Sequence, residues 1–230
     1  MKIVAGLGNP GSAYAGHRHN VGFMALDRLQ ALPGMGPWRS RFQGLACDGT
    51  LGGARVLLLK PQTFMNLSGQ SVSEALRFLK LAPSDLTVVH DDIDLAPGRL
   101  KVKTGGGHAG HNGLRSISQH IGDAYHRVRI GVGHPGHKDA VAPYVLHDFS
   151  KADGAWLDAL LRGIEDGAEA LARQDWPALQ NAVALRAAPP RPPKPRPGPP
   201  PGPPPDAPPD APQATDDPRS VLRRLADRFR

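Results

Sequence analysis

Short apolar runs alternate, along the first half of the chain, with segments that repeat their apolar residues at helical spacing. The runs are residues 3–7, 55–60 and 86–90, and each has the length of a buried strand. Between them, apolar residues recur every three or four positions after Val21 and again after Val72, as in amphipathic helices. This order of strands and helices predicts an α/β fold, with a twisted, mostly parallel mixed sheet flanked by helices.

The same pattern continues through residue 186. Residues 99–103 alternate as a strand, and residues 128–132 form a last core strand. Helical spacing returns at residues 156–171 and 177–185. No internal repeat interrupts the series, so residues 1–186 are predicted to form one domain.

The composition changes sharply after residue 186. Sixteen of the 25 prolines lie between Pro189 and Pro218. Residues 187–218 hold few large apolar groups, which predicts a disordered linker of polyproline-II character. Residues 219–230 regain helical spacing and form a short basic amphipathic segment, too short for a stable isolated helix. The sequence assigns no role to this tail.

Polar side chains follow three of the predicted strands. Asn9 and His19 come after the first strand, residues 64–66 after the second, and Asp91 ends the third. Because ligands bind in open parallel sheets beyond the carboxyl ends of the strands, these distant segments are expected to build one site.

Composition and charge narrow the class of protein. The net charge of +7 is compatible with a polyanionic partner such as nucleic acid. Cys47 is the only cysteine, which excludes an internal disulfide and a structural thiolate zinc site. No apolar run approaches the ~20 residues of a membrane span, and the first residues read as a strand, not a signal peptide. We therefore expect a cytoplasmic protein that needs no membrane.

Residues 6–11 (GLGNPG) match the GxGxxG dinucleotide fingerprint directly after a strand. In that fingerprint the helix begins at the glycines, whereas Pro10 and the residues after it delay the helix to about Asn20. No acidic residue ends a second strand about 20 residues on, and Asp27 lies inside the helix. An enzyme with a nucleotide cofactor stays the weaker alternative.

His19 and Asp91 have the properties of a base and its orienting carboxylate. A helix N-terminus favours the neutral imidazole, and a carboxylate can hold its ring. A metalloenzyme would instead recruit ligands from the acidic and histidine-rich segments, but no segment has the helical H-E-x-x-H pattern. Those ligands would be His90, Asp91, Asp92, His108 and His111. We expect no metal.

The glycine-rich segment of residues 105–113 precedes another helix. Five glycines in nine residues let the backbone approach a ligand closely, and Asn112 is predicted to cap the helix. Lys101, Lys103 and Arg115 flank the segment, an arrangement suited to phosphate groups.

Five segments, in order and spacing, closely resemble the bacterial peptidyl-tRNA hydrolase family over residues 1–186. They are residues 6–11 with Tyr14 and residues 18–22 (RHNVG), residues 60–69 (KPQTFMNLSG), residues 90–98, residues 105–114 and residues 129–136 (RIGVGHPG). One departure is His17, where the family usually has threonine.

The resemblance implies hydrolysis of the ester between a peptide and the terminal ribose of tRNA, in peptidyl-tRNAs dropped off or stalled during translation, without metal or cofactor. It implies that His19 activates water, that Asp91 supports His19, and that Asn9 contacts the peptide carbonyl. It also implies that the binding site for the tRNA end and the peptide main chain is lined by Tyr14, Phe64, Met65, Asn66 and Asn112. An ester is an activated acyl group, so one oriented base and a few amide hydrogen-bond donors are enough to catalyse its hydrolysis.

A non-catalytic RNA-binding or adaptor protein, built around the Pro-rich tail, is the remaining alternative. Similar folds can carry different functions, but the presence of both His19 and Asp91 favours the enzyme. The expected partner is peptidyl-tRNA. The chain is expected to act as a monomer, with no protein partner.

Overall fold

The computed structural model describes residues 1–187 of the chain, which fold around one seven-stranded sheet. The strands are β1 (Lys2–Gly6), β2 (Arg39–Arg41), β3 (Gly44–Leu51), β4 (Ala54–Pro61), β5 (Leu86–Asp92), β6 (Leu100–Thr104) and β7 (His126–Gly131). The helices are α1 (Val21–Gln30), α2 (Ser68–Leu79), α3 (Asn112–Ile121), α4 (Val141–Val145), α5 (Gly154–Asp166), α6 (Ala168–Arg173) and α7 (Trp176–Ala187). The predicted linker and basic segment lie outside the described residues, apart from Ala187 at the end of α7.

The sheet has the strand order β2-β3-β4-β1-β5-β7-β6. Its centre is parallel, because β1 pairs with β4 and β5, and β5 pairs with β7, in the same direction. The outer pairs β2–β3, β3–β4 and β6–β7 are antiparallel. The predicted α/β fold with a mixed sheet and a parallel centre is confirmed.

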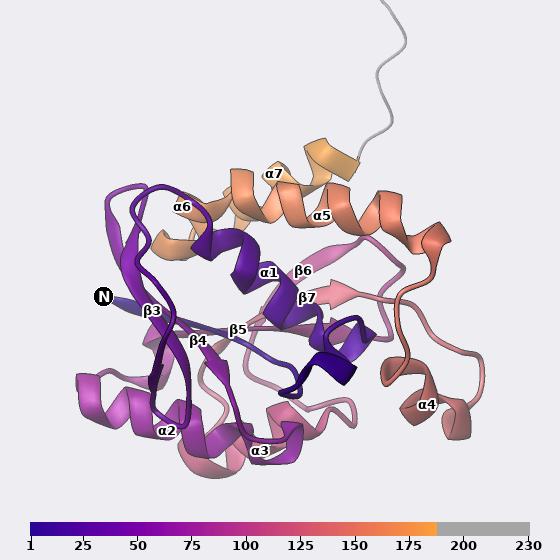
Figure 1. Ribbon diagram of the computed structural model, residues 1–230, viewed down its shortest axis with the longest axis horizontal. Helices are drawn as coiled ribbons and strands as arrows, with labels where there is room; N and C mark the ends of the chain where they lie inside the picture. Colours follow the sequence, from indigo (N-terminus) through magenta and orange to yellow (C-terminus); the bar gives the residue numbers. More distant parts are fainter. Residues whose placement is uncertain (188–230) are drawn as a thin grey trace, which may run out of the picture. The chain divides into compact units, whose positions relative to one another are not determined.

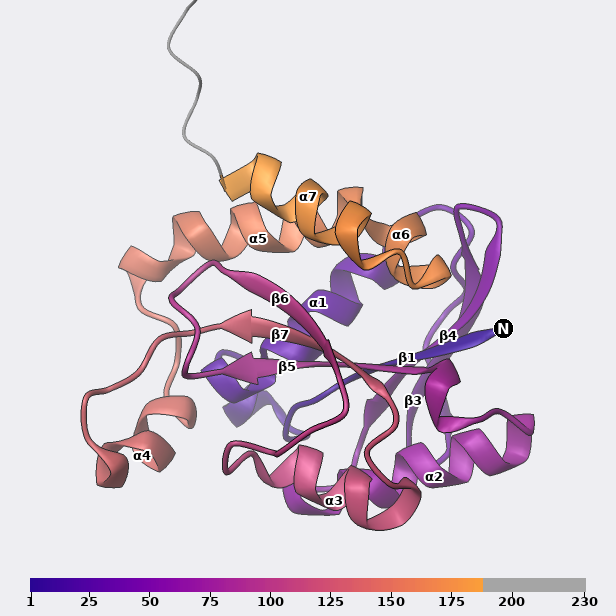
Figure 2. The ribbon, with the colours of Figure 1, turned by 180° about the vertical axis from the view of Figure 1, so that it is seen from behind.

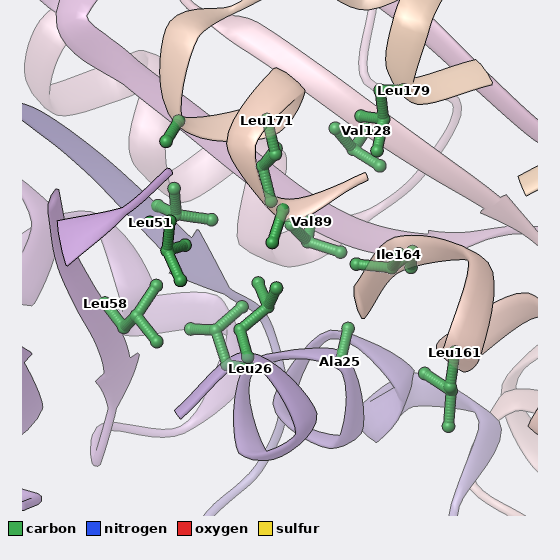
Figure 3. Packing of buried hydrophobic residues seen from close by; sticks show 14 of the residues in the cluster. Ala25, Leu26, Leu51, Leu58, Val89, Val128, Leu161, Ile164, Leu171 and Leu179 are labelled. Carbon is green, nitrogen blue, oxygen red and sulfur yellow. The ribbon is translucent and has the colours of Figure 1, made fainter. Parts of the chain in front are cut away.

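Helices cover both faces of the sheet. In Figures 1 and 2, α1, α5, α6 and α7 lie on one face, and α2 and α3 lie on the other. Alternate residues of β1 supply the two cores: Val4 packs with the first group of helices, and Ile3 and Ala5 pack with the second. Figure 3 shows the first core, where Leu26 of α1 meets Leu58 of β4. Truncating such a leucine to alanine would cost about 2–5 kcal/mol.

Three features differ from the predicted elements. The strands β2 and β3 were not predicted, since β3 (GLACDGTL) is rich in small residues and lacks a strong apolar alternation. The predicted helix 156–171 is two helices, α5 and α6, separated at Gly167. The short helix α4 was also not predicted, and it stands apart from both helical layers at the end toward which β5 and β7 point (Figures 1 and 2).

Glycines let α1 rest directly on the sheet. A Cβ atom at Gly22 would lie 2.4 Å from the carbonyl oxygen of Val89 and 2.5 Å from the amide nitrogen of Leu7. A Cβ atom at Gly6 would lie 2.4 Å from the carbonyl oxygen of Gly22. This close approach brings the turn before α1, which carries His19, to the carboxyl end of β5. None of the helices in the described part of the chain is long and apolar enough to cross a membrane.

Candidate active site

His19 and Asp91 meet at the carboxyl end of the sheet. The Nδ1 atom of His19 lies 2.9 Å from Oδ1 and 3.0 Å from Oδ2 of Asp91. Burial opposes the charged imidazole, but the charge of Asp91 and its hydrogen bond outweigh burial and raise the pKa of His19 above its usual value. Burial likewise opposes the Asp91 carboxylate, yet the neighbouring His19 and His111 hold the pKa of Asp91 far below its usual range.

This contact fixes the tautomer of His19. A carboxylate accepts hydrogen bonds only, so Nδ1 carries the ring proton and donates it to Asp91. The lone pair is then on Nε2, and His19 borders the main cavity of the described structure. His19 can therefore accept a proton there, and Asp91 stabilises the imidazolium that results.

His111 shares the carboxylate of Asp91, a contact that the sequence pattern did not reveal. Its Nε2 lies 3.1 Å from Asp91 Oδ1. Its Nδ1 accepts hydrogen bonds from the amides of Gly113 (3.2 Å) and Leu114 (3.5 Å) at the start of α3. Nδ1 thus holds the lone pair, and the proton on Nε2 is donated to Asp91.

The cap of α3 corrects one prediction. Asn112 was predicted to cap this helix, but His111 is the capping residue, and Asn112 is the first residue of the helix. The Oδ1 atom of Asn112 instead accepts a hydrogen bond from Arg115 at 3.2 Å. Asparagine is far more common than histidine at a helix N-cap, so the cap preferences assigned the cap to Asn112, one residue after the actual cap.

His90 is buried beside this cluster and stays neutral. Burial lowers its pKa to about 3, with His111 adding to the shift. Its ring packs edge-on against His111, with 5.0 Å between the ring centroids. His90 thus packs against the ring of His111 as an uncharged group.

Asn9 is held from two sides. Its backbone amide donates to Oδ1 of Asn20 (3.0 Å), and Nδ2 of Asn20 donates back to the carbonyl of Asn9 (2.9 Å). Its side-chain Oδ1 accepts the amide of Met65 at 2.9 Å. Since the oxygen is engaged, Nδ2 is the atom that Asn9 can offer to a ligand carbonyl.

The segment of residues 64–66 lies beside the same turn. Met65 is buried against the start of α3, where a Cβ atom at Gly113 would lie 2.6 Å from its sulfur. Phe64 is 59% exposed, and Asn66 is exposed as well. Tyr14 is half-buried and packs edge-on against His17, with ring centroids 5.3 Å apart. Met65 is therefore enclosed, while the side chains of Phe64 and Asn66 are accessible at the surface.

A cavity of about 770 Å³ opens next to His19. Of the predicted site residues, it is lined by His19, Asp91, Lys103 and Asn112. It does not reach Asn9, Tyr14, residues 64–66, Lys101 or Arg115. The other lining residues include His111, Arg127, Arg129, His134, Lys138 and, from α4, Val141, Ala142 and Val145.

Two rows of cations face each other across β6 and β7. Lys101 is paired in register with Arg129, and Lys103 with Arg127. Arg129 is neutralised by Asp92, with 2.6 Å between Nε and Oδ2. Like charges directly opposite destabilise a strand pair. The remaining opposed pair, Lys103 and Arg127, therefore favours an anionic ligand.

Arg127 is the most buried of these cations. One guanidinium nitrogen donates to the carbonyl of Gly107 at 2.7 Å, while Nε and Nη2 have no hydrogen-bond partner among the described residues. Arg127 and Arg129 were missed as site residues, although the alternation of basic residues in KVK (101–103) and RVR (127–129) marks both strands.

A metal ion has one candidate site within residues 1–187. Ligand atoms of His19, Asp91 and His111 lie within 4.8 Å of one another. The predicted alternative set from residues 90–92, 108 and 111 is not brought together as a group. The donor chemistry at His111 does not fit a metal, because its Nδ1 already accepts two amide N–H groups and its Nε2 carries the only ring proton. A metal on Nε2 would require an imidazolate.

The comparisons with known proteins agree with this arrangement. The family model of peptidyl-tRNA hydrolase matches residues 3–191. Proteins named peptidyl-tRNA hydrolase are 69% identical in Cereibacter sphaeroides and 57% identical in Ruegeria pomeroyi, each aligned over the whole of both chains. The crystal structure of peptidyl-tRNA hydrolase from Acinetobacter baumannii is 39% identical, has a TM-score of 0.75, and is matched over 80% of this chain and 94% of that one. The chain is therefore a hydrolase that belongs to the peptidyl-tRNA hydrolase family.

Proposed function

We propose that this chain hydrolyses the ester between the peptide and the terminal ribose of peptidyl-tRNA, with His19 as the general base. The observation that carries the proposal is the His19–Asp91 pair beside the cavity, in which Asp91 engages Nδ1 and leaves Nε2 of His19 as the basic atom. Peptidyl-tRNAs dropped off or stalled during translation in the cytoplasm are the substrates, and their hydrolysis recycles the tRNA. The chain acts as a monomer and without a metal ion.

In the first step, Nε2 of His19 takes a proton from a water molecule whose oxygen attacks the ester carbonyl carbon. Asp91 stabilises the imidazolium, and the hydrogen bond from His111 helps to keep Asp91 ionised. When the tetrahedral intermediate collapses, the bond to the ribose oxygen breaks, and His19 returns the proton to that oxygen. The products are the peptide with a free carboxylate and tRNA with a free hydroxyl.

The peptide side of the substrate is assigned to the residues around Asn9. Its Nδ2 donates a hydrogen bond to the peptide carbonyl next to the ester, and this bond orients the ester for attack by water. The main chain and the tRNA end are contacted by Tyr14, Phe64, Asn66 and Asn112, with Met65 as a wall. Asparagine side chains both donate and accept, so they can bind peptides of any sequence.

The tRNA side is assigned to the basic residues on the other side of His19. Lys103 lines the cavity, and Lys101 extends the same row of cations on β6. Arg115 adds an exposed charge on α3. Phosphate groups would relieve the repulsion between Lys103 and Arg127, which lie opposite each other on β6 and β7, and this is the physical argument for tRNA at this surface.

Release of N-acetylamino acid from N-acetylaminoacyl-tRNA tests this function, with free aminoacyl-tRNA as the control substrate. We expect rapid release from the blocked substrate and slow release from the free one. His19→Ala should lower turnover about 10²–10⁴-fold and keep the circular dichroism spectrum of the wild type. Near-normal turnover in this variant would exclude His19 as the base. Tight tRNA binding with no hydrolysis by the wild type would favour the RNA-binding alternative.

A further inference from the structure

We propose that Arg18 is a positioning residue that ties the α4 wall of the cavity to the turn carrying His19. The proposal rests on the function proposed above, in which His19 is the base. Arg18 is buried, although it is charged and directly precedes His19. A buried guanidinium is retained only where its donors are matched by acceptors, so its partners show what it holds together.

The partners of Arg18 all come from the segment that begins at the end of α4. Nη1 donates to the carbonyl oxygens of Asp148 (2.8 Å), His147 (3.2 Å) and Tyr144 (3.5 Å). Nη2 donates to Oδ2 of Asp153 at 3.1 Å. Only the Tyr144 carbonyl belongs to α4, and it also accepts the amide of His147. Arg18 therefore binds mainly the segment that follows α4, through Asp148 and Asp153.

Stacking adds to this attachment. The guanidinium carbon of Arg18 lies 4.3 Å from the ring centroid of Tyr144 and 5.4 Å from that of Phe149. The hydroxyl of Tyr144 donates to the carbonyl of Val132, just beyond β7, at 2.5 Å. The contacts of Arg18 and Tyr144 thus connect the turn before α1, through α4, to the end of β7.

Backbone pairing makes the connection short and stiff. The amide of Arg18 donates to the carbonyl of His147 (3.1 Å), and the amide of Phe149 donates to the carbonyl of Gly16 (3.0 Å). His17 forms an isolated antiparallel bridge with Asp148. Movement of residues 147–149 is consequently transmitted to the turn of residues 16–18, one peptide unit from His19.

Two sides of the site then depend on one side chain. α4 lines the cavity with Val141, Ala142 and Val145, and His19 must keep its 2.9 Å contact with Asp91. A base that is displaced by about 1 Å loses on the order of 10²-fold in rate. Removing the guanidinium should loosen the wall and the base together, which lowers kcat on every substrate and raises KM for intact tRNA.

The test compares Arg18→Met with Arg28→Met. Methionine keeps most of the apolar stem but removes all the donors of Arg18. Arg28 is the matched control, because its guanidinium also joins two elements, α1 and α5, through Asp158 (2.8 Å) and Glu165 (3.2 Å), away from the cavity. We expect Arg18→Met to lower kcat about 10–100-fold. It should do so both on N-acetylaminoacyl-tRNA and on an N-acetylaminoacyl-adenosine ester that lacks the tRNA body, with KM rising only for the former. Arg28→Met should change the Tm but leave kcat within twofold.

A spectroscopic measurement separates positioning from stability. The Nδ1 proton of His19, held by Asp91, should shift in the proton NMR spectrum of Arg18→Met below its Tm and stay unchanged in Arg28→Met. If Arg18→Met does not fold, Arg18→Lys takes its place, since lysine keeps the charge but cannot serve carbonyls and a carboxylate from one planar group. A kcat within twofold of the wild type in the folded variant would overturn the role of Arg18. The proposed function fails on a different result, namely an active His19→Ala variant.

Discussion

His111 donates a hydrogen bond to the same Asp91 oxygen that accepts the ring proton of His19. The amides at the start of α3 hold the lone pair of His111 on Nδ1, so its Nε2 always presents a proton to Asp91. One negative charge thus serves two neutral donors, and a carboxylate that accepts two hydrogen bonds is a weaker base. Asp91 can therefore stabilise the imidazolium of His19 without taking its proton.

The first prediction separates the two roles of His111. His111→Asn keeps a good helix cap but loses the reach to Asp91, whereas His111→Ala loses both. We expect both variants to lose about tenfold in kcat, the effect of one hydrogen bond to a charged group of about 1.5 kcal/mol. Relative to His111→Asn, His111→Ala should lose about a further 1 kcal/mol of unfolding free energy, measured by urea denaturation. Full activity in His111→Asn would show that His111 is a cap alone.

Substitution of Asp91 and substitution of His111 should shift the pKa of His19 in opposite directions. His19 acts when it is unprotonated, so kcat/KM falls as the pH drops through its pKa, which Asp91 raises. Asp91→Asn removes the negative charge, lowers the pKa of His19, and shifts this acid limb to lower pH with a reduced maximal rate. His111→Asn removes the second hydrogen bond to Asp91, so the full charge of Asp91 acts on His19. The pKa of His19 rises further, and the acid limb shifts to higher pH. A pH–rate profile from pH 4 to 9 distinguishes these outcomes, and an Asp91→Asn limb that moves upward would contradict the support by Asp91.

The sequence was sufficient to predict where the polar residues that follow the strands lie. The position of these residues after three apolar runs predicted that they lie at one edge of the sheet, because parallel strands end there. The structure places Met65 against Asn9 and His19 against Asp91. The antiparallel register that sets Lys103 opposite Arg127 is not visible in a linear sequence, since it depends on the length of the connection between β6 and β7. The Asp91 contact of His111 also depends on the helix cap, which the sequence pattern assigned to Asn112.

Removal of transition metals should not affect the reaction. The only three-residue ligand group in the described structure includes His111, whose Nδ1 lone pair is engaged by the α3 amides and whose Nε2 is protonated. Protein dialysed against 1,10-phenanthroline or EDTA is expected to retain its turnover when it is assayed with Mg²⁺ present to keep the tRNA folded. Loss of activity on dialysis, with recovery on addition of Zn²⁺, would instead indicate a catalytic metal.

Asn9→Asp tests the donor on the peptide side. The substitution keeps the shape and the oxygen that accepts the Met65 amide, but it replaces Nδ2 with an oxygen that repels a substrate carbonyl. We expect kcat/KM for N-acetylaminoacyl-tRNA to fall about 10²-fold, because the substrate loses the contact that orients its ester. Asn181→Asp, on the exposed surface of α7, carries the same change of charge and should have no effect. Equal activity of the two variants would exclude Asn9 from substrate contact.

The last prediction concerns the salt dependence of tRNA binding. Each phosphate that a lysine neutralises releases counterions, so the affinity falls as the salt concentration rises. Lys103 lines the cavity opposite Arg127, and Lys103→Ala should flatten the plot of log Kd against log salt by about one unit. Lys151, an exposed lysine in the turn before α5, is outside the cavity lining and provides the matched control. Lys151→Ala should leave the slope unchanged. The cavity would be excluded as the tRNA surface if Lys103→Ala kept the wild-type slope while mutation of Lys151 reduced it.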